Sequence, residues 1–164
     1  GHNDVLAGVV VTNSLELYEK LFYNLNTTGA VLSPFDSYQL LRGLKTLSLR
    51  MERSTANAQG VVAFFKDSPA VKEVLYTGRG GMISFKVADE SRIPHILNSL
   101  KVFSFAESLG GVESLITYPT TQTHADIPAE VRHSYGLTDD LLRLSIGIED
   151  ARDLIADLRQ ALEG

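Results

Sequence analysis

Arg143 is the residue whose type and setting point most directly to binding chemistry. It lies in the run 141–147, LLRLSIG. Side chains alternate along a β-strand, so the two leucines beside Arg143 would share one face and Arg143 would share the other with Ser145. A guanidinium keeps its charge, so one held away from bulk water needs an anion, and its planar fork suits a carboxylate. The residues alone leave two interpretations open: an anion site, or an edge-strand arginine in a structural ion pair, which is the commoner fate of a lone arginine.

A glycine-rich segment upstream could complete such an anion site. Ser108-Leu109-Gly110-Gly111 offers one hydroxyl together with flexible backbone. Because glycine permits a close approach of the main chain, the amides of this segment could reach the same anion as Arg143. The pair of elements predicts one binding face built from a strand and a turn.

Two other patterns look like sites but are better explained without chemistry. His2 and Asp4 could pair on a metal ion, but no third ligand lies near them, so a structural role is favoured. The glycines of 77–81 resemble a phosphate loop. They lack the spacing of a nucleotide fingerprint and precede a strand rather than a helix, so a tight hairpin turn is expected.

Composition limits the classes of function. The chain has 164 residues, 44% of them hydrophobic and 21% charged, with a net charge of -5 and no cysteine. This is the composition of a globular protein, and the negative charge argues against nucleic acid or an anionic membrane surface as partner. Without cysteine there is neither a disulfide nor thiolate chemistry. No apolar run is long enough to span a membrane and no signal peptide precedes His2, so we expect a cytoplasmic protein.

Several long blocks resemble one enzyme family in the same order. They are GHNDVLAG at the start, TGAVLSPFDSYQLLRGLKTLSLRM, ESLGGVESL, the T-x-T-H-A of 121–125, and LLRLSIGIEDARDLIADL. Together they resemble the transsulfuration enzymes that depend on pyridoxal phosphate (PLP), the cystathionine γ-synthase and lyase family. The match runs from Gly1 to the last residues, so chance agreement is not a reasonable explanation.

The resemblance implies roles for four residues. Arg143, in the L-R-L-S word, and Ser108, in S-L-G-G, would bind the substrate carboxylate. Thr123, in the T-H-A word, would lie near the cofactor lysine and that carboxylate. At the position of Glu107, γ-synthases and γ-lyases of the family carry glutamate while many β-lyases carry an aromatic residue, so its charge could meet the distal ammonium of cystathionine. A solvated glutamate is the alternative for Glu107.

The cofactor lysine implied by the resemblance is not in this sequence. In the family a lysine holds PLP as a Schiff base in a short motif that ends in Gly-His, which corresponds here to Gly1-His2. That lysine would lie before Gly1, so the chain would be a C-terminal fragment of a larger enzyme. None of the lysines present matches a cofactor motif: Lys20, Lys45, Lys66, Lys72, Lys86 and Lys101. We therefore expect no catalytic residue and no covalently bound PLP in the fragment, and its cofactor-binding residues stay unassigned.

Three functions remain open. The first is a cystathionine γ-synthase, a transferase of methionine biosynthesis that joins cysteine to an activated homoserine. The second is a β- or γ-lyase that cleaves cystathionine. The third is a folded module that is catalytically silent. The implied partners of the parent enzyme are amino acids (a homoserine ester, cysteine and cystathionine) and three further copies of itself in a homotetramer.

The first part of the chain is expected to belong to a different domain from the rest. By resemblance, residues 1–43 are the tail of the PLP-binding large domain and residues 44–164 are the C-terminal small domain, with the boundary inside a long helix near Gly43. The apolar run 4–11 predicts a strand buried on both faces of a parallel sheet, whose orphaned edge would make the fragment self-associate. Asn13–Glu16 predicts a capped helix start. Apolar residues at helical spacing predict a long helix whose apolar stripe belongs to the protein core. The stripe consists of Leu40, Leu41, Leu44, Leu47 and Met51.

The second part alternates strands with helices. Strands are expected at 71–76, 82–87, from 102, at 114–118 and at the LLRLSIG run, and helices at 90–100, from Pro128 and over about 151–162. Tight turns between them predict an α/β protein whose small domain is of the α+β type. Its sheet would be mostly antiparallel or mixed and covered by helices on one side. The resemblance implies the C-terminal domain of a fold type I PLP enzyme.

Overall fold

A computed structural model describes all residues from Gly1 to Gly164, and it contains two compact units. One unit is residues 2–46 and the other is residues 47–164 together with Gly1. The change from one unit to the other falls between Thr46 and Leu47. The assignment of the first unit to a cofactor domain stays a prediction.

The first unit contains two helices, each with a serine at its N-cap. Helix α1 (Leu15–Thr28) begins at Ser14, whose side chain accepts a hydrogen bond from the backbone of Leu17, as the capped start at 13–16 predicted. It ends at Gly29, which has a positive φ of 68°. Helix α2 (Pro34–Leu44) begins at Ser33, which caps the backbone N–H of Asp36.

The apolar run 4–11 does not form the predicted strand. Residues 4–12 have no regular secondary structure, and Leu6 and Val9 are 96% and 87% exposed. A strand needs a neighbour for its backbone N–H and C=O groups, and none of the five strands of this chain pairs with the run. An apolar pattern alone therefore predicted a strand that lacks a partner here.

The expected long helix is interrupted. Helix α2 ends at Leu44 and α3 (Leu47–Asp67) begins three residues later. The Gly43 carbonyl accepts both the backbone N–H and the hydroxyl of Thr46, each at 3.3 Å, so a tight turn replaces the helical pattern. The stripe predicted as core is also wrong for this chain, because its five members are 40% to 64% exposed.

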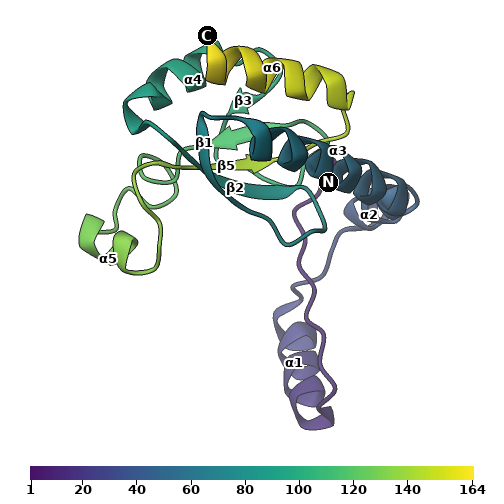
Figure 1. The fold of residues 1–164 in the computed structure, drawn as a ribbon. Coiled ribbons are helices and arrows are strands. Elements are labelled where there is room, and N and C mark those ends of the chain that lie inside the picture. The colour runs from purple at the N-terminus through teal and green to yellow at the C-terminus, as the bar shows by residue number, and fades with distance from the viewer. The chain divides into compact units, whose positions relative to one another are not determined.

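The second unit is built on a mixed five-stranded sheet in the order β1-β2-β5-β4-β3 (Figure 1). The strands are β1 (Val71–Leu75), β2 (Met82–Val87), β3 (Ser104–Phe105), β4 (Leu115–Thr117) and β5 (Leu141–Ser145). All neighbours are antiparallel except β3 and β4, which are parallel. The predicted hairpin at 77–81 joins β1 to β2, so its glycines serve a turn. These pairings confirm the mixed, mostly antiparallel sheet.

Helices cover one face of this sheet, as the sequence predicted. Helix α3 packs beside α6 (Ala151–Glu163), and α4 (Ile93–Ser99), which follows the short 3₁₀ turn η1 (Glu90–Arg92), packs against the other side of α6 (Figure 1). The short helix α5 (Ala129–Ser134) lies apart from these three. The core between helices and sheet includes the side chains of Phe65, Phe85, Leu142, Leu144 and Leu158, each at most 1% exposed. Full burial of such side chains stabilises the fold by about 1.5–3 kcal/mol each.

A buried carboxylate anchors α6 to the segment before β3. Asp157 is 5% exposed, and its carboxylate accepts the backbone N–H groups of Lys101, Val102 and Phe103 at 2.7–3.1 Å. Several backbone donors satisfy a buried charge without an ion pair. The strand that leads into the 106–111 turn is therefore fixed to the helical layer.

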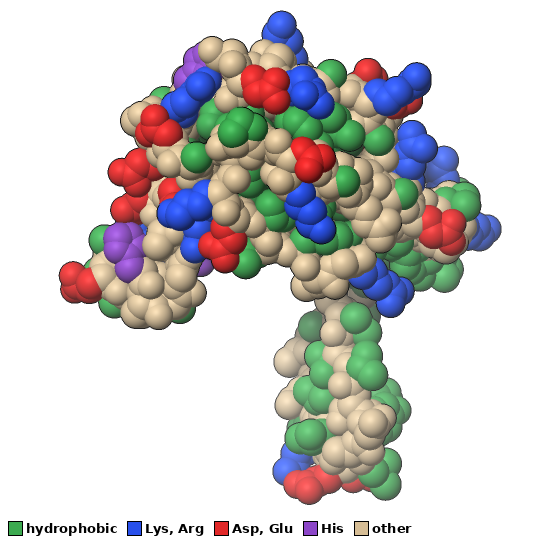
Figure 2. Space-filling view, in the orientation of Figure 1, with side chains coloured by type: hydrophobic (Ala, Val, Ile, Leu, Met, Phe, Trp, Pro, Cys, Tyr) green, Lys and Arg blue, Asp and Glu red, His purple; other side chains and the backbone are tan.

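The surface of the second unit carries both signs of charge. Figure 2 shows acidic and basic side chains interspersed over its visible face rather than gathered by sign. No helix of the chain is long and apolar enough to cross a membrane.

Candidate functional site

Arg143 projects from β5 on the sheet face that the helices leave uncovered. Its strand neighbours Leu142 and Leu144 are fully buried in the core, so alternation places Arg143 on the opposite face. Arg143 lies opposite Ser84 of β2 and Thr117 of β4. The predicted strand and the alternation of its side chains are therefore confirmed.

The Arg143 side chain is held by neutral groups of the chain. Its Nη2 donates to the backbone carbonyl of Glu107 at 2.9 Å and to the hydroxyl of Thr117 at 3.1 Å. Arg143 makes no salt bridge. The alternative of a structural ion pair therefore finds no partner in this chain.

The guanidinium of Arg143 keeps hydrogen-bonding capacity for a ligand. Its Nε is buried without a partner, whereas Nη1 makes no hydrogen bond and is not buried. Burial lowers the pKa of Arg143, and the nearby carboxylate of Glu107 opposes that shift. An anion bound at Nη1 would offset the free-energy cost of removing the charge of Arg143 from water.

Three hydrogen bonds that involve side chains fix the 106–110 turn to the same sheet face. The hydroxyl of Thr117 donates to the carbonyl of Ala106 at 2.7 Å, and Arg143 donates to the carbonyl of Glu107. The backbone N–H of Gly110 donates to the hydroxyl of Ser145 at 2.8 Å. Gly110 has a φ of 70°, a conformation that an L-residue rarely adopts, so the turn depends on glycine there.

This turn carries two of the residues that the sequence singled out. Glu107 and Ser108 are both exposed, and the Ser108 hydroxyl makes no hydrogen bond within the chain. The structure brings Glu107 to Arg143 through its backbone carbonyl, and Ser108 is the next residue along the turn. The strand and the turn that the sequence singled out therefore lie next to each other.

Thr123 lies outside the cluster formed by Arg143, Thr117 and the 106–110 turn. It is exposed in the loop between β4 and α5, and its hydroxyl is 2.7 Å from Nδ1 of His124. The loop is held by the buried Arg132, which donates to the carbonyl of Thr120 and forms an ion pair with Asp139 at 3.2 Å. No hydrogen bond joins Thr123 to Arg143 or to the 106–110 turn.

Thr117 is the member of the cluster that sequence reasoning missed. It is 1% exposed and bonds both Arg143 and the turn. Alternation within β4 would have placed the side chain of Thr117 on the sheet face that the buried Ile116 does not occupy. Only the pairing of β4 with β5 reveals its proximity to Arg143, and no local pattern encodes that register.

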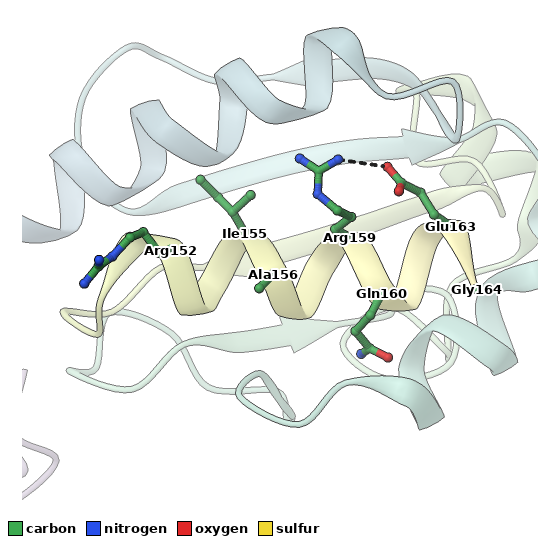
Figure 3. Close-up of a pocket in the computed structure, with 7 residues that line it drawn as sticks. All are labelled: Arg152, Ile155, Ala156, Arg159, Gln160, Glu163 and Gly164. Atoms are coloured by element: carbon green, nitrogen blue, oxygen red, sulfur yellow. Dashed lines mark ion pairs between the residues drawn. The ribbon is translucent and has the colours of Figure 1, made fainter.

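A hollow on α6 does not offer comparable chemistry. It has a volume of about 660 Å³ and lies along the outer surface of the helix, where Ile155, Arg159 and Glu163 point to one side (Figure 3). Arg159 is paired with Glu163 at 3.5 Å and lies over the ring of Phe64. Its charged groups already have partners, so the hollow is part of the helix packing surface. No group of three or more potential metal ligands occurs in the chain.

Known proteins resemble this chain in sequence and in fold. The chain is 55% identical over 162 residues to the cystathionine γ-synthase/O-acetylhomoserine (thiol)-lyase of Bacillus subtilis, covering 99% of this chain and 43% of that protein. It is 54% identical over 161 residues to the cystathionine γ-synthase of Haemophilus influenzae, covering 98% and 44%. The crystal structure of the cystathionine γ-synthase of Xanthomonas oryzae pv. oryzae in complex with cystathionine matches with a TM-score of 0.89 at 40% identity, covering 99% and 46%.

The chain spans less than half the length of these relatives. The family described as Cys/Met metabolism PLP-dependent enzyme matches residues 1–163. That match covers nearly every residue of both units and confirms the family indicated by the sequence blocks. The chain therefore belongs to the Cys/Met metabolism enzymes that depend on PLP.

Proposed function

We propose that the whole protein is a cystathionine γ-synthase and that residues of this chain bind the α-carboxylate of its substrate. In this reaction the Cγ–O bond of a homoserine ester breaks, the Cγ–S bond to cysteine forms, the acid leaves and the thiol proton is lost. The similarity to two γ-synthases supports this activity. Relatives named γ-lyase and β-lyase match nearly as well, so cystathionine cleavage is the second candidate.

The observation that carries the proposal is an arginine without an ion pair on the open face of the sheet. Both oxygens that Arg143 contacts within the chain meet Nη2, so Nη1 retains its N–H groups for a ligand. An α-carboxylate at Nη1 would supply the missing negative charge, and the free hydroxyl of Ser108 would add a second contact from the turn. Holding the carboxylate fixes the orientation of the α-carbon.

Glu107 is proposed to select the far end of the substrate. Its carboxylate is exposed and close enough to raise the pKa of Arg143 against the effect of burial. The distal ammonium of cystathionine is the substrate group of opposite charge. Thr123 is proposed to lie near the cofactor lysine on the basis of its T-H-A word alone.

PLP supplies the electron sink in enzymes of this family, and its anchoring lysine is proposed to be none of the six lysines of this chain. A Schiff base needs a lysine amine. Lys86 lies on the Arg143 face of β2 by alternation, but its amine is 2.7 Å from the carboxylate of Glu73, and its side chain is 17% exposed. A lysine held in that ion pair does not fit the role. The contribution of this chain is therefore to bind and orient the substrate.

The remaining expectations for the parent protein stay proposals. These are a cytoplasmic location, a homotetramer, a role in methionine biosynthesis, and a chain that is catalytically silent and self-associating when alone. The exposed apolar residues of the first unit support self-association, since Leu15, Tyr23 and Val31 are each about 70% exposed.

A product assay of the full-length protein tests the proposed activity. With a homoserine ester and cysteine, a γ-synthase yields cystathionine. With cystathionine alone, a γ-lyase yields cysteine and 2-oxobutanoate, and a β-lyase yields homocysteine and pyruvate. Cystathionine as the main product supports the proposal, whereas faster cleavage than synthesis would replace it with the lyase alternative.

A further inference from the structure

Thr117 is a buried hydroxyl that joins the two parts of the proposed carboxylate site. It is 1% exposed and lies directly opposite Arg143 in the β4–β5 pair. Its Oγ1 donates to the carbonyl of Ala106 at 2.7 Å and accepts from Nη2 of Arg143 at 3.1 Å. One side chain thus contacts both the arginine and the first residue of the turn.

The chemistry of these partners fixes the direction of both hydrogen bonds. A carbonyl oxygen only accepts and a guanidinium only donates, so the Thr117 hydroxyl must donate to Ala106 and accept from Arg143. The second bond has a charged donor, which makes it stronger than a neutral one. Water has little access to a side chain at 1% exposure, so it cannot readily replace a lost hydroxyl.

The contacts to Nη2 decide which edge of the guanidinium remains for a ligand. Thr117 and the Glu107 carbonyl both meet Nη2, and Nη1 is left without a partner within the chain. If the Thr117 hydroxyl were lost, Nη2 would keep only the Glu107 carbonyl as its partner, and the guanidinium could turn about that single hydrogen bond. The Ala106 carbonyl would lose its side-chain donor at the same time.

We infer that Thr117 is a positioning residue that aims Nη1 of Arg143 and the Ser108 turn at the same substrate carboxylate. The inference rests on the proposed role of Arg143 and adds the group that orients it. Thr117 does not touch the substrate itself. It acts by holding the guanidinium and the turn in one arrangement.

The experiment measures how well the full-length, PLP-loaded protein distinguishes a carboxylate from an amide. The probes are L-alanine and L-alaninamide, which differ in that group alone, and calorimetry gives their dissociation constants. The readout is the ratio of the amide constant to the acid constant. Thr117→Val keeps the side-chain shape without the hydroxyl, and Thr117→Ser keeps the hydroxyl. Thr55→Val is the matched control, because Thr55 accepts a hydrogen bond from Gly80 in the β1–β2 turn.

Thr117→Val should lower the ratio by roughly tenfold, the effect of one lost hydrogen bond to a charged group. Thr117→Ser should stay within about threefold of the original ratio, since its hydroxyl can replace both bonds. Thr55→Val should leave the ratio unchanged even if its melting temperature falls. Where Thr117→Val does not fold, Thr117→Ala removes the same hydroxyl with less bulk and carries the same expectation.

Two different failures can be told apart. If the hydroxyl-free variant keeps the original ratio while Arg143→Lys lowers it, the role of Thr117 is overturned and the carboxylate site stands. If the unaltered protein does not distinguish the acid from the amide, or Arg143→Lys leaves the ratio unchanged, the proposed site itself is overturned. A loss of melting temperature at a constant ratio would mean that Thr117 only stabilises the sheet.

Discussion

The carboxylate of Glu149 accepts two hydrogen bonds from Ser114, one from the Ser114 backbone and one from the Ser114 side chain. The Ser114 backbone N–H donates to Oε1 at 2.6 Å and the Ser114 hydroxyl donates to Oε2 at 2.9 Å. The same hydroxyl accepts the backbone N–H of Gly147 at 2.9 Å. Ser114 precedes β4 and Glu149 follows β5, so the pair joins the strands that carry Thr117 and Arg143.

Glu149→Ala should therefore destabilise the unit that contains Arg143. The change leaves the backbone N–H of Ser114 without its acceptor, at a residue that is fully buried. We expect a loss of about 1–3 kcal/mol, seen as a lower melting temperature of the full-length protein. Glu163→Ala is the matched control, because its ion pair with Arg159 is exposed and should contribute little. Equal effects of the two variants would contradict the role of Glu149.

Gly147→Ala should prevent correct folding. A Cβ atom there would overlap the carbonyl oxygen of Val112 and would lie 2.7 Å from the carbonyl carbon of Glu113. Backbone cannot give way as a flexible side chain can, so we expect a cost of at least about 3 kcal/mol and little soluble protein.

Gly60→Ala provides the opposite expectation in the same unit. Gly60 lies inside α3, and its added Cβ would meet only Cδ1 of Ile155 at 3.8 Å, an ordinary contact. Alanine should stabilise the helix by about 0.5–1 kcal/mol. The yield of soluble protein, together with thermal unfolding of whatever folds, measures the contrast, and a Gly147→Ala protein as soluble and stable as Gly60→Ala would contradict the close packing after β5.

Arg143 shows how much of the site the sequence could predict. Alternation in LLRLSIG was enough to place Arg143 away from the core, because its two leucine neighbours are fully buried. The 108–111 segment was predicted to approach the same strand, and the backbone N–H of Gly110 does donate to Ser145 of β5, because glycine permits a turn that approaches a strand closely. Local patterns suffice where the periodicity of one strand or the chemistry of one turn determines the outcome.

Features that depend on distant partners were missed or wrong. The contact of Thr117 with Arg143 arises from strand register, which joins residues 26 positions apart. The run 4–11 has strand composition but finds no pairing strand, and the turn at Thr46 interrupts a stripe that reads as one helix. A buried Asp157 is likewise hidden in the sequence, because its three backbone donors come from a segment more than 50 residues away.

Glu107→Ala should alter the choice of substrate in the full-length enzyme. If its exposed carboxylate meets the distal ammonium of cystathionine, the variant should handle cystathionine less well than substrates without that ammonium. A partly solvated charge pair is worth roughly 0.5–2 kcal/mol. The comparison of kcat/KM for the two kinds of substrate measures this difference. Equal losses for both would remove the reason to assign specificity to Glu107.

Arg143→Lys in the full-length enzyme tests the central claim most directly. Lysine keeps the positive charge but cannot donate to the Glu107 carbonyl, the Thr117 hydroxyl and a carboxylate with the same planar geometry. We expect KM to rise and kcat/KM to fall by about tenfold to a thousandfold, with PLP still bound and the melting temperature little changed. Kinetic constants close to those of the unaltered enzyme together with a lowered melting temperature would show that Arg143 only braces the sheet, and would contradict the carboxylate site.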